Sequence, residues 1–254
     1  MKKHFLFFTI LLLSSQLFSQ VLKGKSLESY KGFFNFYYEE AQDKIYLEVD
    51  KLDEEFLYVN SLVTGIGSND IGFDRGQIGD QRVVKFIRRG DKLLLVQPNQ
   101  NYRAITDNEL EKKSVAQAFA QSVLFGFKIE NETGNKFIVD FSPFLLQDAH
   151  GTIDTLARKE EGNYILDLSK SELSLERTKE FPKNVEFEAL LTFRGQPKGK
   201  NIKSVTPTPS LVSVIQHHSF IELPDDNYTM REFDPRSGTI YISYLDYATP
   251  IQEP

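Results

Sequence analysis

Four histidines are the side chains of this sequence best suited to zinc or acid–base chemistry: His4, His150, His217 and His218. A zinc protease of the H-E-x-x-H type needs two histidines one helical turn apart, with the glutamate as general base. None of the four begins that motif. His217 and His218 are neighbours on a predicted strand, so their side chains should point to opposite faces and not share one metal ion. The sequence predicts no metal ligand and no cofactor in this chain.

The common nucleophiles do not suggest another active site. The chain has no cysteine, which excludes a thiol nucleophile and a disulfide framework. No serine lies in a G-x-S-x-G motif, and scattered Ser, His and Asp positions do not define a triad. We therefore expect no catalytic residue in this chain.

Residues 65–80, hereafter the 65–80 loop, are the best candidate for a binding surface. Five glycines permit unusual backbone angles there: Gly65, Gly67, Gly72, Gly76 and Gly79. Polar candidate binding residues lie among them: Asn69, Asp70, Asp74, Arg75 and Asp80. They could present backbone and carboxylate groups to a peptide or a cation, although the spacing fits neither an EF-hand nor a P-loop. A structural turn with an internal Asp–Arg pair remains the alternative.

A second polar turn lies near the C-terminus. In residues 234–238 (DPRSG), proline favours a turn and glycine releases the chain into the next strand. Asp234 and Arg236 either brace this turn or dock it against another domain.

Strand-like alternation decides the fold class. Apolar residues at every second position predict strands, and they occur in four runs: Ile45, Leu47 and Val49; Phe137, Val139 and Phe141; Val185, Phe187, Ala189, Leu191 and Phe193; Ile240, Ile242 and Tyr244. Gly90 and Gly162 each lie where a hairpin turn would join two such segments. The sequence predicts a mainly β protein with antiparallel sheets in a sandwich-like arrangement.

One segment has helical spacing instead. Between residues 107 and 125, Val115, Phe119 and Val123 lie four apart and form an apolar stripe. Thr106 with Glu109 fits a capping box, and Gly126 is a plausible stop. We expect one amphipathic helix packed on a sheet.

The N-terminus has the order of a signal peptide: two lysines, an apolar run at 5–13, then small and polar residues. We expect cleavage after residue 19, a secreted or periplasmic location, and no membrane attachment afterwards. Residues 20–32 are predicted to be a linker, and residues 33–254 one β-rich region or two subdomains. The acidic balance, with net charge −6, argues against a nucleic-acid partner.

Two sets of segments carry a family resemblance. The first is residues 56–77 (FLYVNSLVTGIGSNDIGFDRGQ), 82–86 (RVVKF) and 94–99 (LLVQPN). The second is residues 214–224 (VIQHHSFIELP), 231–238 (REFDPRSG) and 243–250 (SYLDYATP). In this order they resemble the N-terminal region of large secreted bacterial zinc-dependent metalloproteases. The resemblance implies a zinc-bearing H-E-x-x-H domain after these segments, which this sequence does not contain.

Three hypotheses follow from these observations. The favoured one is a non-catalytic region, truncated or separately encoded, whose partner is the zinc domain and whose role is to support that domain and shape its cleft for a peptide substrate. A free-standing module that binds peptide or glycan through the 65–80 loop is the alternative. An autonomous enzyme of another type is the third.

Overall fold

The computed structural model describes residues 25–225, 227, 229, 231, 233–238, 240 and 242–249. The predicted signal peptide lies outside these residues. Before residue 110 the strands are β1 (Glu28–Tyr30), β2 (Asn35–Glu39), β3 (Lys44–Val49), β4 (Glu55–Leu62), β5 (Ile78–Arg89), β6 (Lys92–Gln97) and β7 (Tyr102–Arg103). The later strands are β8 (Ser122–Thr133), β9 (Lys136–Asp140), β10 (Gly162–Leu166), β11 (Glu172–Phe181), β12 (Asn184–Pro197), β13 (Leu211–Glu222) and β14 (Leu245–Asp246). The α-helices are α2 (Glu109–Ala118), α3 (Ser142–Leu145), α4 (Thr152–Arg158) and α5 (Lys200–Val205), and two 3-10 turns are η1 (Glu40–Gln42) and η2 (Leu168–Lys170).

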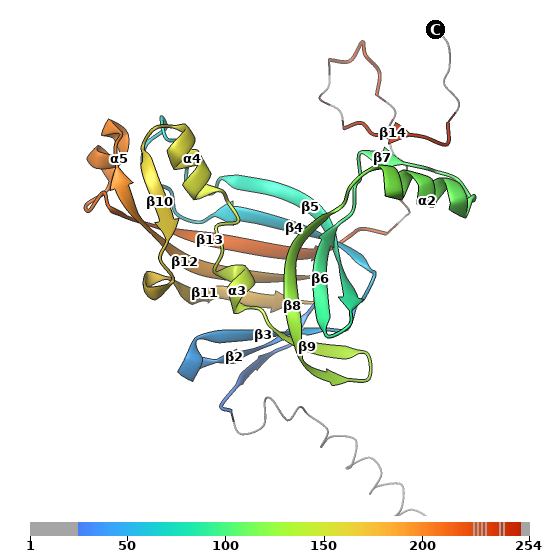
Figure 1. Cartoon of the computed structure of the whole chain (residues 1–254), viewed down its shortest axis with the longest axis horizontal. Coiled ribbons are helices and arrows are strands. Elements are labelled where there is room, and N and C mark those ends of the chain that lie inside the picture. Colours follow the sequence, from blue (N-terminus) through green and yellow to red (C-terminus); the bar gives the residue numbers. More distant parts are fainter. Residues whose placement is uncertain are drawn as a thin grey trace, which may run out of the picture.

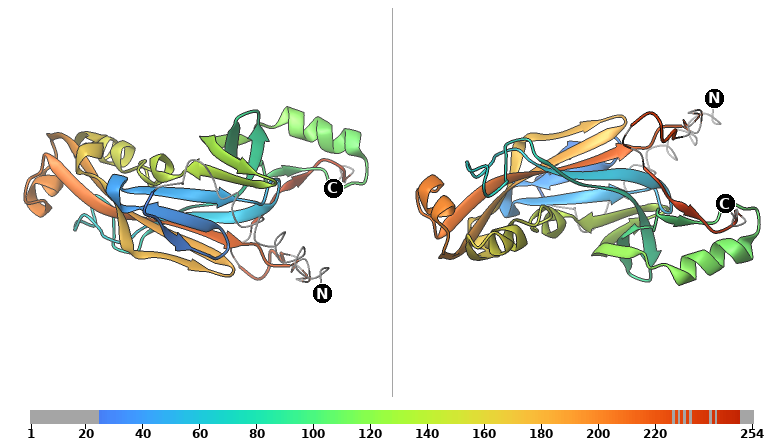
Figure 2. Two further views of the ribbon diagram at one scale, coloured as in Figure 1. Left: turned by 90° about the horizontal axis from the view of Figure 1, so that it is seen from below. Right: turned by 90° about the horizontal axis from the view of Figure 1, so that it is seen from above.

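Strands β1–β6 and β8–β13 form one large antiparallel sheet in the order β1-β2-β3-β9-β8-β6-β5-β4-β13-β12-β10, with β11 also paired to β12. The sheet curls, so that β2 and β3 pack against the strands at its other end (Figures 1 and 2). Phe36 of β2 lies 5.1 Å from Phe187 of β12 between ring centroids, and Phe34 lies 5.3 Å from Phe56 of β4. The predicted fold class, mainly β and antiparallel with sandwich-like packing, is confirmed.

The alternating runs explain this packing. Val185, Phe187, Ala189, Leu191 and Phe193 are all buried, because they share the inner face of β12. The predicted hairpin at Gly90 joins β5 and β6, with Arg89 opposite Lys92. The hairpin predicted at Gly162 is wrong, because Leu156 belongs to helix α4. The predicted strand at 240–244 is also displaced: the described residues there are not strand, and β14 begins at Leu245.

The predicted helix exists as α2, but it differs from the expectation in its end and its packing. Asn108, and not Thr106, caps it, since its side chain accepts from Leu110 N. The helix ends at Ala118 and has no buried residue. Residues from Ser122 onward instead form β8. Pairing with β6 gives their backbone N–H and C=O groups hydrogen-bond partners, and the same strand buries the Phe127 ring. The prediction that this helix packs on the large sheet is therefore wrong, because α2 lies beside β7 (Figure 1).

The predicted linker at 20–32 contains the edge strand β1, whose Glu28 is paired with Tyr38 of β2. None of the helices in the described part of the chain has the length and apolar character needed to cross a membrane.

Candidate functional site

The 65–80 loop connects β4 to β5 and is anchored by apolar side chains. Ile66, Ile71 and Phe73 are buried in the core between β13 and α4. The backbone N–H of Ile66 donates to the Phe73 carbonyl at 3.0 Å, and Gly72 has a φ of 86°, which favours glycine. The loop is thus a packed connection whose last residues, 78–80, begin β5.

The structure separates the polar residues predicted in this loop. Asn69, Asp70, Asp74 and Arg75 are exposed, and Arg75 makes no ion pair with either aspartate in the described structure. The internal Asp–Arg pair is therefore not formed. Asp80 pairs instead with Arg82 of β5, and it is the one predicted residue that lines the neighbouring cavity.

That cavity has a volume of about 480 Å³ and lies between the 65–80 loop and α4. Its lining combines apolar and polar side chains: Asn60, Ile71, Phe73, Gln77, Ile78, Asp80, Ala149, His150, Thr155, Arg158 and Lys159, with Gly72 and Gly79. Its volume suits a small ligand or one peptide side chain with its neighbours. We therefore treat it as the candidate site and name it the His150 cavity.

Helix α4 positions His150. The Asp148 carboxylate accepts from the backbone N–H groups of Thr152 and Ile153, both at 2.8 Å, and so caps the helix start. Gly151, with a φ of 72°, turns the chain between the cap and the helix. The turn fixes the His150 ring at the cavity.

The protonation of His150 follows from its partners. Arg82 can only donate, so Asn60 Oδ1 accepts from it at 3.2 Å, and Asn60 Nδ2 donates to His150 Nδ1 at 3.0 Å. The proton then lies on Nε2, which donates to Gln77 Oε1 at 3.1 Å. Burial lowers the pKa of His150, which agrees with a neutral ring. Gly79 has no room for a Cβ atom beside Asn60 and His150.

His218 lies behind this cavity on the inner face of β13 and is fully buried. Gln216 Oε1 accepts from the His150 backbone N–H at 3.0 Å, and Gln216 Nε2 donates to the Gln147 carbonyl at 2.9 Å. The same amide nitrogen donates to His218 Nε2 at 2.9 Å, so this ring carries its proton on Nδ1, which donates to the Tyr58 hydroxyl at 2.9 Å. Burial lowers the pKa of His218 to about 3.

His217 points to the opposite face, as the strand geometry predicts. Its Nε2 lies 2.8 Å from Glu186 Oε2 and its Nδ1 lies 3.2 Å from Glu188 Oε1. Burial lowers the pKa of His217, but the hydrogen bonds and charges of these two carboxylates outweigh it, and the net pKa is raised. His217 therefore favours the doubly protonated ring.

Replacing Glu186 with glutamine is expected to lower the pKa of His217, because the ring loses one of its two carboxylate partners. Since the folded-state pKa is raised, this pair stabilises the fold below pH 6.5, and the contribution is lost as the pH rises through that raised pKa. NMR titration of the imidazole measures the shift. Glu176→Gln, at an exposed position on β11, is the control. An equal pKa of His217 in the two variants would contradict the claim that Glu186 raises it.

Asp234 and Arg236 bond to each other within the turn at 234–238. Arg236 Nη2 donates to Asp234 Oδ2 at 2.6 Å, and the Arg236 backbone N–H donates to Asp234 Oδ1 at 2.9 Å. The Arg236 side chain lowers the pKa of Asp234 through this bond. Both side chains are solvent-accessible.

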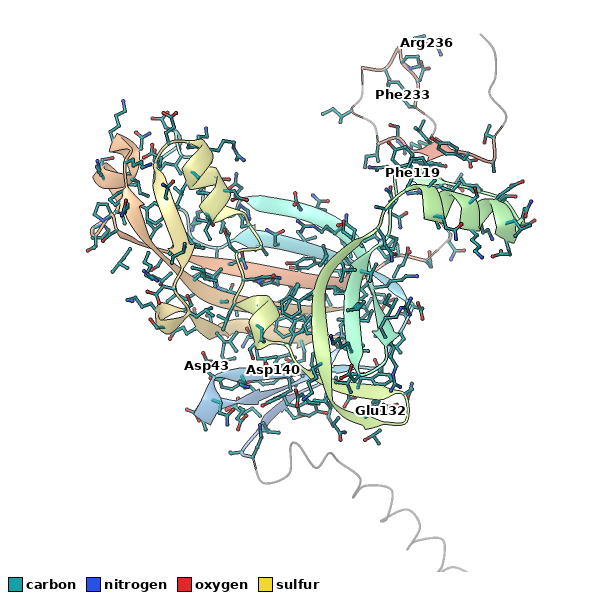
Figure 3. All side chains as sticks on the ribbon, in the orientation of Figure 1. Asp43, Phe119, Glu132, Asp140, Phe233 and Arg236 are labelled. Atoms are coloured by element: carbon teal, nitrogen blue, oxygen red, sulfur yellow. The ribbon has the colours of Figure 1, made fainter. Side chains whose placement is uncertain are left out.

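The turn belongs to a peripheral unit, hereafter the C-terminal module, made of α2, β7, β14 and the described residues 233–249 (Figure 3). Strand β14 pairs in parallel with β7. The rings of Tyr102 and Phe119 stack with centroids 3.9 Å apart, and Tyr247 lies 5.2 Å from Phe119. Large apolar side chains of this module are exposed, namely Leu110, Phe233, Ile240, Ile242, Leu245 and Tyr247, as is Ile105 between β7 and α2.

Sequence reasoning missed most of the His150 cavity. Its key polar residues come from separate elements: Asn60 from β4, Gln77 from the loop, His150 before α4, and Arg158 at the end of α4. The available signal was Asp148 followed by His150 and Gly151, a helix-capping turn that carries a histidine.

Two family models match most of the chain. Residues 76–254 match the family described as Domain of unknown function (DUF5117), and residues 16–65 match Domain of unknown function (DUF5118). The curated proteins and the solved structures compared with this chain gave no match. Strands from both matched regions share one sheet, because β3 pairs with β9 and β4 pairs with β13. Since the longer match covers well over half of the sequence, the chain belongs to the DUF5117 family.

Proposed function

We propose that this chain is the non-catalytic, β-rich part of a secreted zinc-dependent metalloprotease. In this role it supports a separate H-E-x-x-H domain and shapes the cleft that receives a peptide substrate. The resemblance of residues 56–99 and 214–250 to the front part of such proteases supports this role.

The exposed apolar surface of the C-terminal module carries the proposal. Ile240 and Ile242 are each 100% exposed, and Leu110 on α2 is 76% exposed. Exposed apolar patches commonly mark surfaces that another protein covers. The family resemblance places the zinc domain after these residues, which makes that domain the expected occupant.

The zinc ion belongs to the partner in this proposal, because the donors described here do not fit a zinc site. Three protein ligands around one point are needed, and the described residues contain no such group of His, Asp or Glu. His217 and His218 diverge across the sheet, and both ring nitrogens of His217 already contact carboxylates.

A binding experiment tests the docking surface. The chain and an H-E-x-x-H domain from a metalloprotease of the resembled type are produced separately, and their affinity is measured by calorimetry. We expect Ile242→Asp to weaken binding about tenfold or more, because it places a charge in an apolar contact. The fold should be retained, since Ile242 is fully exposed.

Leu168→Asp is the matched control, because Leu168 is also an exposed apolar residue but lies on η2, in another part of the fold. It should leave the affinity unchanged. Absence of binding, or equal losses in the two variants, would contradict this docking surface. Zinc-dependent cleavage of casein by this chain alone would contradict the non-catalytic role.

The His150 cavity favours a second candidate, a free-standing module that binds peptide or glycan. A chain that binds such a ligand but no H-E-x-x-H protein would support this candidate over the first.

A further inference from the structure

The floor of the His150 cavity is fixed before any ligand arrives. The facing side-chain atoms of Asn60 and His150 bond to each other, and Arg82 and Gln77 hold their other ends. Ile71 and Phe73 are packed in the core and form an apolar wall. A ligand would therefore enter a preorganised site, where little conformational freedom is lost on binding.

The cavity is lined by side chains whose hydrogen-bond donors are not all used by the protein. Gln77 Oε1 accepts from His150, but its amide nitrogen has no hydrogen bond to the described residues. Arg158 donates to the Thr155 hydroxyl at 3.0 Å and makes no ion pair with a described residue. Lys159 likewise has no side-chain partner in the described part of the chain. Three donors, two of them cationic, are thus available at one cavity.

The acidic side chain of the cavity does not cancel this positive charge, because Asp80 is paired with Arg82 outside it. His150 contributes no charge at neutral pH, since burial lowers its pKa. Asp148 also acts on His150, but its carboxylate accepts from the first backbone N–H groups of α4, so among the described residues Arg158 and Lys159 are the unpaired charges that line the cavity, in a chain whose net charge is −6. Such a site selects an acceptor with negative charge.

We propose that the His150 cavity binds a carboxylate of a peptide, with Arg158 and Lys159 facing the carboxylate and the Gln77 amide donating to the same group. This inference rests on the proposed function for the peptide nature of the ligand. The negative charge of the ligand, in contrast, is inferred from the cavity residues alone. The carboxylate can belong to an acidic side chain or to a peptide C-terminus.

The test uses the full chain and four probes. Two are end-blocked pentamers of alanine whose central residue is aspartate or asparagine, the third is pentaalanine with a free C-terminal carboxylate, and the fourth is inorganic phosphate. Fluorescence anisotropy of labelled peptides gives the affinities, and NMR follows the Gln77 amide and the His150 ring. At least one carboxylate peptide should bind about tenfold more tightly than the asparagine peptide. Which one does so identifies the source of the carboxylate.

Arg158→Gln with Lys159→Gln should remove about tenfold or more of that affinity. The matched control is Arg177→Gln with Lys179→Gln, two exposed cations on β11 away from the cavity, and it should change nothing. Equal binding of the aspartate, asparagine and free-carboxylate peptides would overturn the proposal, as would binding of phosphate alone. The docking experiment tests the C-terminal module, whereas this one tests the His150 cavity. A negative result for carboxylate binding therefore leaves the proposed function intact, and the two proposals can fail separately.

Discussion

Acidification from pH 6.5 to pH 4 is expected to lower the free energy of unfolding by about 3 kcal/mol through His218 alone. His218 is 0% exposed, and burial lowers its pKa from 6.5 to about 3. Its neutral ring is also required by geometry, because the Gln216 amide donates to the nitrogen that a second proton would occupy. The unfolded chain takes up this proton readily, whereas the folded chain does not.

The sign follows from linkage. The folded-state pKa is depressed, so the stabilisation from a neutral His218 is fully present above pH 6.5 and is lost as the pH falls toward 3. Other groups also contribute on acidification, since hydrogen bonds to Lys170 and Ser169 lower the pKa of Asp167 to about 2. A comparison of two variants is needed to isolate the histidine.

Urea unfolding of the wild type and of His218→Gln, measured at several pH values, makes this comparison. Below pH 6.5, the free energy of unfolding of the wild type should fall relative to that of His218→Gln by about 1.4 kcal/mol per pH unit, because glutamine does not titrate. His217→Gln is the control. Because the pKa of His217 is raised, the free energy of unfolding of the wild type should rise relative to that of His217→Gln as the pH falls. Parallel pH curves for wild type and His218→Gln would show that His218 takes up a proton as readily in the folded chain as in the unfolded chain, which would contradict the lowered pKa.

Local alternation predicted the fold class and the inner faces of the buried strands, although it failed at residues 240–244. Phe187 and His218 are buried opposite each other on one face of the sheet, whereas Glu188 and His217, one residue away on each strand, meet on the other face, where Glu188 is also buried. The side-chain period of a strand dictates this outcome whatever the topology. The divergence of His217 and His218 was predictable for the same reason.

Features that depend on distant contacts were not predictable in this way. Phe119 to Leu124 has helical spacing, but pairing of β8 with β6, determined by residues about thirty positions earlier, makes Ser122 onward a strand. The His150 cavity depends on contacts of still longer range, since Asn60 meets His150 across 90 residues of sequence. The 65–80 loop was predicted to be a binding surface, and of the polar residues predicted to bind in it only Asp80 lines the His150 cavity.

The contact between the two ends of the curled sheet is formed by aromatic rings, and Phe187 is central to it. Its ring lies 5.1 Å from Phe36, 5.4 Å from Phe141 and 6.1 Å from Phe220 between centroids. Phe187→Ala should lower the free energy of unfolding by about 3–5 kcal/mol, because it removes buried apolar area and leaves a cavity that the surrounding rings cannot fill.

Urea unfolding measures this loss, and Phe181→Ala provides the matched control from the adjacent strand β11. Phe181 is 47% exposed, so its truncation should cost no more than about 1 kcal/mol. Similar losses in both variants would mean that β2 and β12 are not held together through Phe187. A large loss for Phe187→Ala, with an unchanged dependence of the unfolding free energy on urea concentration, would instead show that the curled sheet unfolds as one unit. That result is expected, because the pairing of β3 with β9 and of β4 with β13 joins all parts of the sheet.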